Sequence, residues 1–153
     1  MLNRLKGRAA TLENAEKKTE TPKVAFVCVH NSCRSQIAEA FGRKLGAGVF
    51  EAFSAGTALK DRINPDAVRL MRERGFDLEA TQRPKTLDAI PTPDVVVTMG
   101  CGVVCPFVPG ASVEDWGLED PTGRDDAFFE TVIDEIERRV GELVERLREK
   151  RGI

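Results

Sequence analysis

The sequence predicts an α/β fold, a single three-layer domain in which a four-stranded parallel sheet is flanked by helices. Its 153 residues suit one domain with a buried core. From residue 23 onward, short apolar runs alternate with segments of helical periodicity, which is the order expected of strands and helices in a parallel sheet. The runs at residues 24–29 and 94–99 are nearly continuous, as in strands that are covered on both faces.

The sequence predicts four strands and three helices. The strands are expected at residues 24–29, 49–54, 94–99 and 112–116. The helices are expected at residues 35–45, 65–74 and 129–147. Gly46 ends the first helix, and Asn64 before Pro65 supplies an N-cap and a favourable first position for the second. In the last helix, apolar residues at alternating spacings of four and three make one apolar face, opposite a face of Arg and Glu.

Composition and charge narrow the class of protein. Hydrophobic residues make up 41% of the chain and charged residues 31%, which is typical of a soluble globular protein. The net charge of −2 provides no general attraction to nucleic acid, and no apolar run approaches the roughly 20 residues that cross a bilayer. We therefore expect no nucleic-acid partner and no membrane partner. We also expect the protein to be a monomer and to need no cofactor and no metal.

The first 22 residues are predicted to be a mobile N-terminal extension that precedes the domain at residues 23–153. Apolar residues recur there at helical spacing, but a polar run follows, and chain termini are often poorly ordered. The segment has no hydrophobic stretch of the kind found in secretory signals. We therefore expect a cytoplasmic location, where cysteines stay reduced unless they have a metal or redox role.

The turn at residues 28–34 has the features of an anion site. It follows a strand, and ligands of parallel sheets bind beyond the carboxyl ends of the strands; the same rule brings residues 99–105 and the segment after Trp116 to this crevice. Backbone N–H groups of the turn and the helix N-terminus favour a tetrahedral anion, and Arg34 can bind two of its oxygens. The same positive field favours the thiolate form of Cys28, a candidate nucleophile. The candidate anion-binding residues are Val29, His30, Asn31, Ser32, Cys33, Arg34 and Ser35.

The four cysteines fall in two clusters, Cys28 with Cys33 and Cys101 with Cys105. Buried cysteines often serve only as small core residues, and this alternative stands for each of them. For Cys33, packing is favoured over a spare thiol. A metal site built from all four is a further alternative, but structural zinc sites prefer cysteines two residues apart and give no role to Arg34.

Three motifs resemble those of the low-molecular-weight tyrosine phosphatase superfamily. They are Cys28-x5-Arg34-Ser35, Ser54-Ala55-Gly56-Thr57 and Asp120-Pro121. The resemblance runs from about Lys23 to the C-terminus. Within the superfamily, the pair Cys101 and Cys105, with Pro106 and with Trp116-Gly117, resembles the thioredoxin-coupled arsenate reductases.

The resemblance implies an enzyme that reduces arsenate, a tetrahedral oxyanion similar to phosphate. Cys28 attacks the central atom while Arg34 and the loop amides hold the charge on the oxygens. Asp120 protonates the departing oxygen as general acid. The alternative for Asp120 is a turn residue before Pro121.

The resemblance also implies a relay of thiols. Cys101 attacks Cys28 and arsenite leaves, and Cys105 then attacks Cys101, so that a Cys101–Cys105 disulfide awaits thioredoxin. Gly100 and Gly102 make this segment deformable. The two cysteines are closer together than is typical of the thioredoxin-coupled enzymes, which leaves a small thiol as an alternative reductant.

A phosphatase that uses Cys28, Arg34 and Asp120 is the alternative enzyme. Phosphatases of this superfamily usually carry tyrosines after the Asp-Pro pair, where they line the phosphotyrosine cleft. In this chain residues 122–124 are Thr-Gly-Arg, and there is no tyrosine at all. A cleft without aromatic walls suits a small inorganic anion better than an aryl phosphate.

Overall fold

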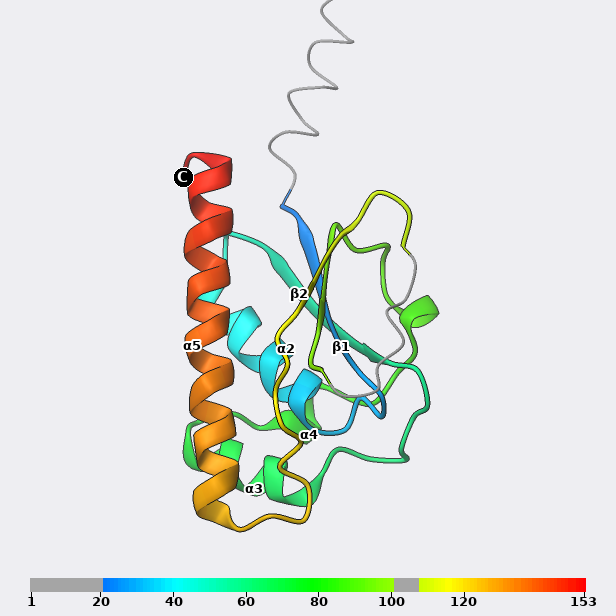
Figure 1. Cartoon of the computed structure of the whole chain (residues 1–153), viewed down its shortest axis with the longest axis vertical. Helices are drawn as coiled ribbons and strands as arrows, with labels where there is room; N and C mark the ends of the chain where they lie inside the picture. Colours follow the sequence, from blue (N-terminus) through cyan, green and yellow to red (C-terminus); the bar gives the residue numbers. More distant parts are fainter. Residues whose placement is uncertain (1–20, 101–107) are drawn as a thin grey trace, which may run out of the picture.

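The computed structural model describes residues 21–100 and 108–153 (Figure 1). Its centre is a sheet whose four strands are all parallel, in the order β2-β1-β3-β4. The strands are β1 (Lys23–Cys28), β2 (Glu51–Gly56), β3 (Val95–Thr98) and β4 (Ser112–Asp115). The predicted α/β fold with a four-stranded parallel sheet is therefore confirmed. Most of the predicted N-terminal extension, residues 1–20, lies outside the described residues.

The longer helices gather on one face of the sheet. Helix α2 (Arg34–Leu45) packs between the sheet and α5 (Asp126–Arg151), and α3 (Pro65–Glu73) and α4 (Leu78–Thr81) lie near the end where β1 finishes (Figure 1). The main core forms between this layer and the sheet. Its fully buried side chains include Phe26, Ile37, Phe41, Phe129, Ile133 and Ile136. In the part of the chain that the structure describes, no helix is long and apolar enough to cross a bilayer.

The opposite face of the sheet carries a smaller cover, with the 3₁₀-helix η1 (Leu87–Ala89) on it (Figure 1). Ala25, Val27 and Val96 form the sheet side of this second core, and Leu87, Ile90, Val108 and Ala111 pack against them. The sequence pattern did not predict η1 or α4. Both are too short to show a helical period in the sequence.

Helices α3 and α2 begin in different ways. Asn64 Oδ1 accepts the N–H groups of Asp66 at 2.8 Å and Ala67 at 3.2 Å, and Pro65 takes the first helical position, as predicted. Helix α2 starts differently, because the side chain of its N-cap residue, Cys33, makes no capping hydrogen bond. The N–H groups at the start of α2 are therefore not bonded by the side chain of the N-cap residue.

Gly56 ends β2 at the point where the loop after β1 passes over it. A Cβ at this position would lie 2.9 Å from Val29 O and 2.9 Å from Asn31 N. Only backbone movement could relieve such contacts, so we expect Gly56→Ala to lower the free energy of unfolding by about 1–3 kcal/mol. Gly141→Ala in α5 is the matched control, because a Cβ there would have nothing within 4 Å, and we expect it to be neutral or stabilising. Urea unfolding checks both variants, and a Gly56→Ala protein as stable as wild type would contradict the close approach.

Candidate functional site

The loop between β1 and α2 is held from outside by residues 57–64. Three of its carbonyl groups, those of Val29, His30 and Ser32, accept hydrogen bonds from backbone N–H groups of that segment, at N···O distances of 2.8–3.3 Å. The donors are Thr57, Ala58, Lys60 and Asn64. The Ser32 hydroxyl adds a bond to Arg62 O at 3.0 Å. The loop is thus fixed along most of its outer side.

These contacts turn the N–H groups of the loop inward. In a trans peptide, the C=O of one residue and the N–H of the next point in opposite directions. Since three carbonyls face residues 57–64, the N–H groups of His30, Asn31 and Cys33 face the inside of the loop. They add to the partial positive charge at the N-terminus of α2. The loop therefore has the form of a site for an anion.

The thiol of Cys28 lies at the base of this loop and is only 4% exposed. Its Sγ is 2.8 Å from the Oγ of Ser35, and Asn31 Nδ2 donates to the same Oγ at 2.8 Å. Asn31 Oδ1 accepts the N–H of Lys85 at 2.9 Å. A backbone N–H can only donate, so this contact sets the orientation of the Asn31 amide. Because Asn31 fills one acceptor position of the Ser35 oxygen, the Ser35 O–H is free to donate to the Cys28 sulfur when this is a thiolate.

Asn31 connects the loop to a buried group of polar side chains. It has a left-handed backbone with φ of 47°, a conformation that Asn tolerates better than most residues. The residue that holds its side chain, Lys85, pairs through Nζ with the buried Glu39 Oε1 at 3.2 Å. Burial lowers the pKa of Lys85, and the charge of Glu39 opposes this shift. Lys85 therefore helps to hold the loop in position through Asn31, a role that the sequence did not predict.

Arg34 is also buried, at 5% exposure, in the first turn of α2. Its Nη1 donates to Leu118 O at 2.7 Å and to Met99 O at 3.2 Å. The segments after β3 and β4 that carry these carbonyls touch each other, because a Cβ at Gly100 would lie 2.8 Å from Gly117 Cα. The guanidinium is thus held by hydrogen bonds at the edge of the sheet where β1, β3 and β4 end.

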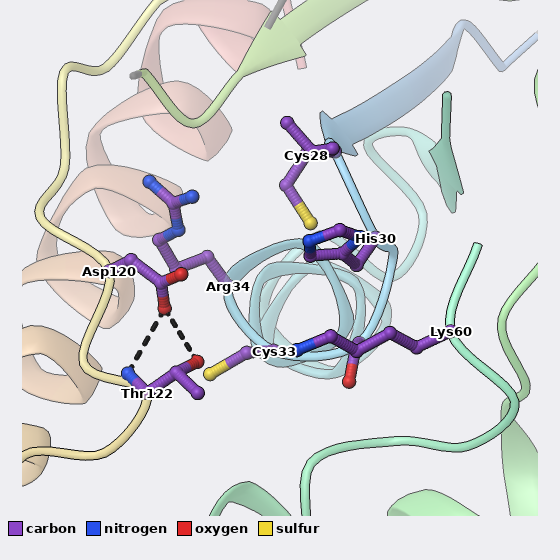
Figure 2. A pocket seen from close by; sticks show the side chains of 9 residues that line it. Cys28, His30, Cys33, Arg34, Lys60, Asp120 and Thr122 are labelled. Carbon is purple, nitrogen blue, oxygen red and sulfur yellow. Dashed lines mark hydrogen bonds between the residues drawn. The ribbon is translucent and has the colours of Figure 1, made fainter. Parts of the chain in front are cut away.

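Asp120 lies beside Arg34 on the segment after β4 (Figure 2). The hydroxyl of Thr122 donates to Asp120 Oδ1 at 2.7 Å, and the N–H of Thr122 donates to the same atom at 3.0 Å. Burial by itself raises the pKa of Asp120, but these bonds and the charges of Arg34 and Lys60 outweigh burial, so the pKa lies below its usual value. Without a bound anion, Asp120 is therefore a carboxylate at neutral pH.

Cys33 differs from Cys28 in its surroundings. Burial raises the pKa of the Cys33 thiol, and the negative charges of Asp120 and Cys28 raise it further. Arg34 and a hydrogen bond with Thr122 act in the opposite direction without cancelling the rise. Cys33 therefore stays a thiol at neutral pH, and it packs into the main core while one side faces the site.

A pocket of about 230 Å³ brings most of the predicted residues together (Figure 2). Those that line it are Cys28, Val29, His30, Ser32, Cys33, Arg34 and Asp120. Asn31 and Ser35 are fully buried and support the wall through the hydrogen bonds above. His30 Nδ1 lies 2.8 Å from Ala58 O and donates to it, since a carbonyl can only accept. Cys101 and Cys105 lie outside the described residues.

Two further residues line this pocket and were missed by the sequence analysis, Lys60 and Thr122. Thr122 could have been noticed, because an Asp two residues earlier commonly accepts hydrogen bonds in a turn. Lys60 has no local signal, since it reaches the pocket only through the contacts of residues 57–64 with the loop. Within residues 21–100 and 108–153, no three His, Cys, Asp or Glu side chains are grouped to hold a metal ion.

Comparison with known proteins gives a consistent result. The profile of the low molecular weight phosphotyrosine protein phosphatases matches residues 23–152. A glutaredoxin arsenate reductase from Synechocystis is 40% identical over 129 residues, which cover 82% of this chain and 98% of the relative. Arsenate reductase 1 from Staphylococcus epidermidis is 35% identical over 136 residues, covering 86% and 99% of the two chains.

Solved structures extend this likeness to three dimensions. An arsenate reductase in the phosphate-binding state matches with a TM-score of 0.74 and 38% identity, over 83% of this chain and 99% of the other. The thioredoxin-dependent arsenate reductase of Corynebacterium glutamicum matches with a TM-score of 0.72 and 38% identity, over 95% of this chain and 72% of the other.

Proposed function

The chain belongs to the low molecular weight phosphotyrosine protein phosphatase family, and on that basis we propose that it is an arsenate reductase that uses Cys28 as its nucleophile. One observation carries the proposal: a buried thiol lies at the base of a loop with the form of an anion site, 2.8 Å from the Ser35 hydroxyl, which can donate to a thiolate. The names of the relatives, which are arsenate reductases, support arsenate as the oxyanion.

The first step forms a bond between sulfur and arsenic. The Cys28 thiolate attacks the arsenic atom, and one arsenate hydroxyl leaves as water after it takes a proton from Asp120. Arg34 and the inward N–H groups hold the charge on the remaining oxygens. Asp120 must first gain that proton, and a bound anion next to it favours this because a neighbouring negative charge raises a carboxyl pKa.

The second part of the proposal is the thiol relay, whose residues are assigned from their spacing and the family resemblance. Cys101 attacks the sulfur of Cys28, and the electron pair of the sulfur–arsenic bond passes to arsenic, which leaves as arsenite. Cys105 then attacks Cys101 and releases Cys28 as a thiolate. A Cys101–Cys105 disulfide remains, and two electrons from an external dithiol restore both thiols.

We propose thioredoxin as that reductant, on the resemblance to the thioredoxin-coupled reductases; its two thiols can reduce such a disulfide through a mixed disulfide. The name of the C. glutamicum relative supports this choice, whereas the name of the Synechocystis relative points to glutaredoxin. The purified full-length chain tests the proposal directly. We expect arsenate-dependent NADPH oxidation and arsenite formation with thioredoxin and its reductase, and slower turnover with glutaredoxin and glutathione.

A phosphatase is the alternative that the same test addresses. The pocket has no Phe or Trp among the described residues that line it, which disfavours an aryl phosphate. If the chain hydrolyses para-nitrophenyl phosphate and does not turn over arsenate with either reductant, it is a phosphatase and not an arsenate reductase. Arsenate turnover with weak hydrolysis of the ester is the expected result.

The proton of Asp120 gives the reaction a defined pH dependence. A general acid must be protonated, so the rate falls as pH rises through the pKa of Asp120 in the substrate complex. Thr122→Val removes the hydroxyl that stabilises the carboxylate, which raises this pKa. We expect the basic limb of the kcat profile to move up by about one pH unit, whereas Thr122→Ser keeps the wild-type limb. A basic limb that is unchanged or moves to lower pH in Thr122→Val would contradict the acid role of Asp120.

A further inference from the structure

Lys60 contributes a positive charge to the pocket from outside the loop at residues 28–34. Figure 2 shows its side chain extending from the neighbouring segment toward the space around Cys28 and Cys33. Its ammonium makes no hydrogen bond and no ion pair with any residue in the described ranges, unlike the ammonium of Lys85, which is paired with Glu39. The Lys60 charge is therefore available to something that enters the pocket.

The backbone of Lys60 is tied to the loop that it faces. Its N–H donates to His30 O at 3.3 Å, and the N–H of Ala58 donates to Val29 O at 2.8 Å. Asn64, four residues later, donates to Ser32 O at 2.8 Å. Because the segment is fixed on both sides of Lys60, its flexible side chain starts from a defined position at the pocket rim.

The charges of the pocket show why a second cation matters. When Cys28 is a thiolate and Asp120 a carboxylate, the pocket holds two negative charges, and Arg34 supplies one positive charge. With histidine counted as neutral, the pocket without Lys60 would carry a net negative charge and would oppose a doubly charged oxyanion. Lys60 brings the sum to zero, and the N-terminus of α2 then makes the site favourable for an anion.

We propose that Lys60 is a substrate-binding residue, which holds the doubly charged oxyanion together with Arg34. This inference rests on the proposed function, because it names a further residue that binds the substrate of that reaction. The charge of Lys60 also contributes to the lowered pKa of Asp120, so the ammonium lies near this carboxylate of the pocket wall. Lys60 is exposed, whereas Arg34 is buried, so an entering anion can meet Lys60 first.

Equilibrium binding of inorganic phosphate to the full-length chain, measured by calorimetry at neutral pH, tests this inference. We expect Lys60→Gln to raise the Kd for phosphate about tenfold, since a hydrogen bond to a charged group is lost. Lys60→Arg keeps the charge and should bind phosphate within about twofold of wild type. The C-terminal end of α5 lies far from the end of β1 where the loop begins (Figure 1). Lys150 belongs to the last turn of α5, so Lys150→Gln removes the same charge and should leave the Kd unchanged.

Two results would overturn the role of Lys60. One is a Kd for Lys60→Gln equal to that of wild type, and the other is an equal loss in Lys150→Gln, which would reduce the effect to net charge. The assay uses neither arsenate nor a reductant. If the wild-type chain fails to reduce arsenate, the proposed function falls, while weaker phosphate binding by Lys60→Gln would still assign Lys60 to the anion site.

Discussion

Replacing Cys28 by Ser is expected to abolish arsenate reduction, with a loss of at least about 10⁴-fold in kcat. The serine hydroxyl fits the same space but is not ionised at neutral pH, so it cannot form the bond to arsenic. The N–H groups of the loop and Arg34 are unchanged, so phosphate should still bind. Steady-state assays of arsenite formation, combined with phosphate calorimetry on the same preparation, measure both quantities.

Phosphate binding serves as the control for this variant, because it shows that the loop is intact. A Cys28→Ser protein that binds phosphate and still turns over arsenate at more than about one hundredth of the wild-type rate would remove Cys28 as nucleophile. Loss of ester hydrolysis in the same variant is also expected, since the first step of either reaction requires the thiolate.

Replacing Cys101 or Cys105 by Ser is expected to stop repeated turnover of arsenate while any hydrolysis of phosphate esters continues. The two variants should stop at different points. Without Cys101, nothing attacks the Cys28 adduct and no arsenite leaves. Without Cys105, each chain should release one arsenite and then stop with a Cys28–Cys101 disulfide. Quantifying arsenite per chain in a rapid-quench experiment separates these outcomes.

Two results with these variants would contradict the thiol relay. Undiminished arsenate turnover in both variants would show that the electrons come from another source. A Cys105→Ser protein that releases arsenite continuously with thioredoxin, and not once per chain, would show that the reductant acts directly on the Cys28–Cys101 pair. Cys33 is a poor substitute for either, because burial raises the pKa of its thiol.

Local patterns in the sequence predicted much of this molecule. Continuous apolar runs predicted β1 and β3, two strands of the parallel sheet. Asn64 and Pro65 predicted the start of α3, where the Asn64 side chain accepts the two cap hydrogen bonds. The loop from Cys28 to Arg34 was likewise found from its position between a strand and a helix. In each case the residues that carry the signal are neighbours in the chain.

The features that the sequence did not predict depend on contacts between distant segments. Lys85 reaches Asn31 across 54 positions, and Lys60 is placed by bonds between residues 57–64 and the loop. The need for glycine at Gly56 also appears only when the loop lies over β2. No local period or motif encodes such pairings. The roles of Lys85 in holding the loop and of Lys60 as the second cation of the pocket therefore follow only from the three-dimensional structure.

Mass spectrometry of the wild-type chain after one turnover tests the central claim most directly. The reduced protein is mixed with arsenate in the absence of an external reductant, and the products are digested and mapped. The account predicts the loss of two hydrogens per chain, one arsenite released, and a disulfide between Cys101 and Cys105 with Cys28 free. Arsenite formed without loss of the two hydrogens, or a final disulfide that joins Cys28 to Cys33, would contradict it.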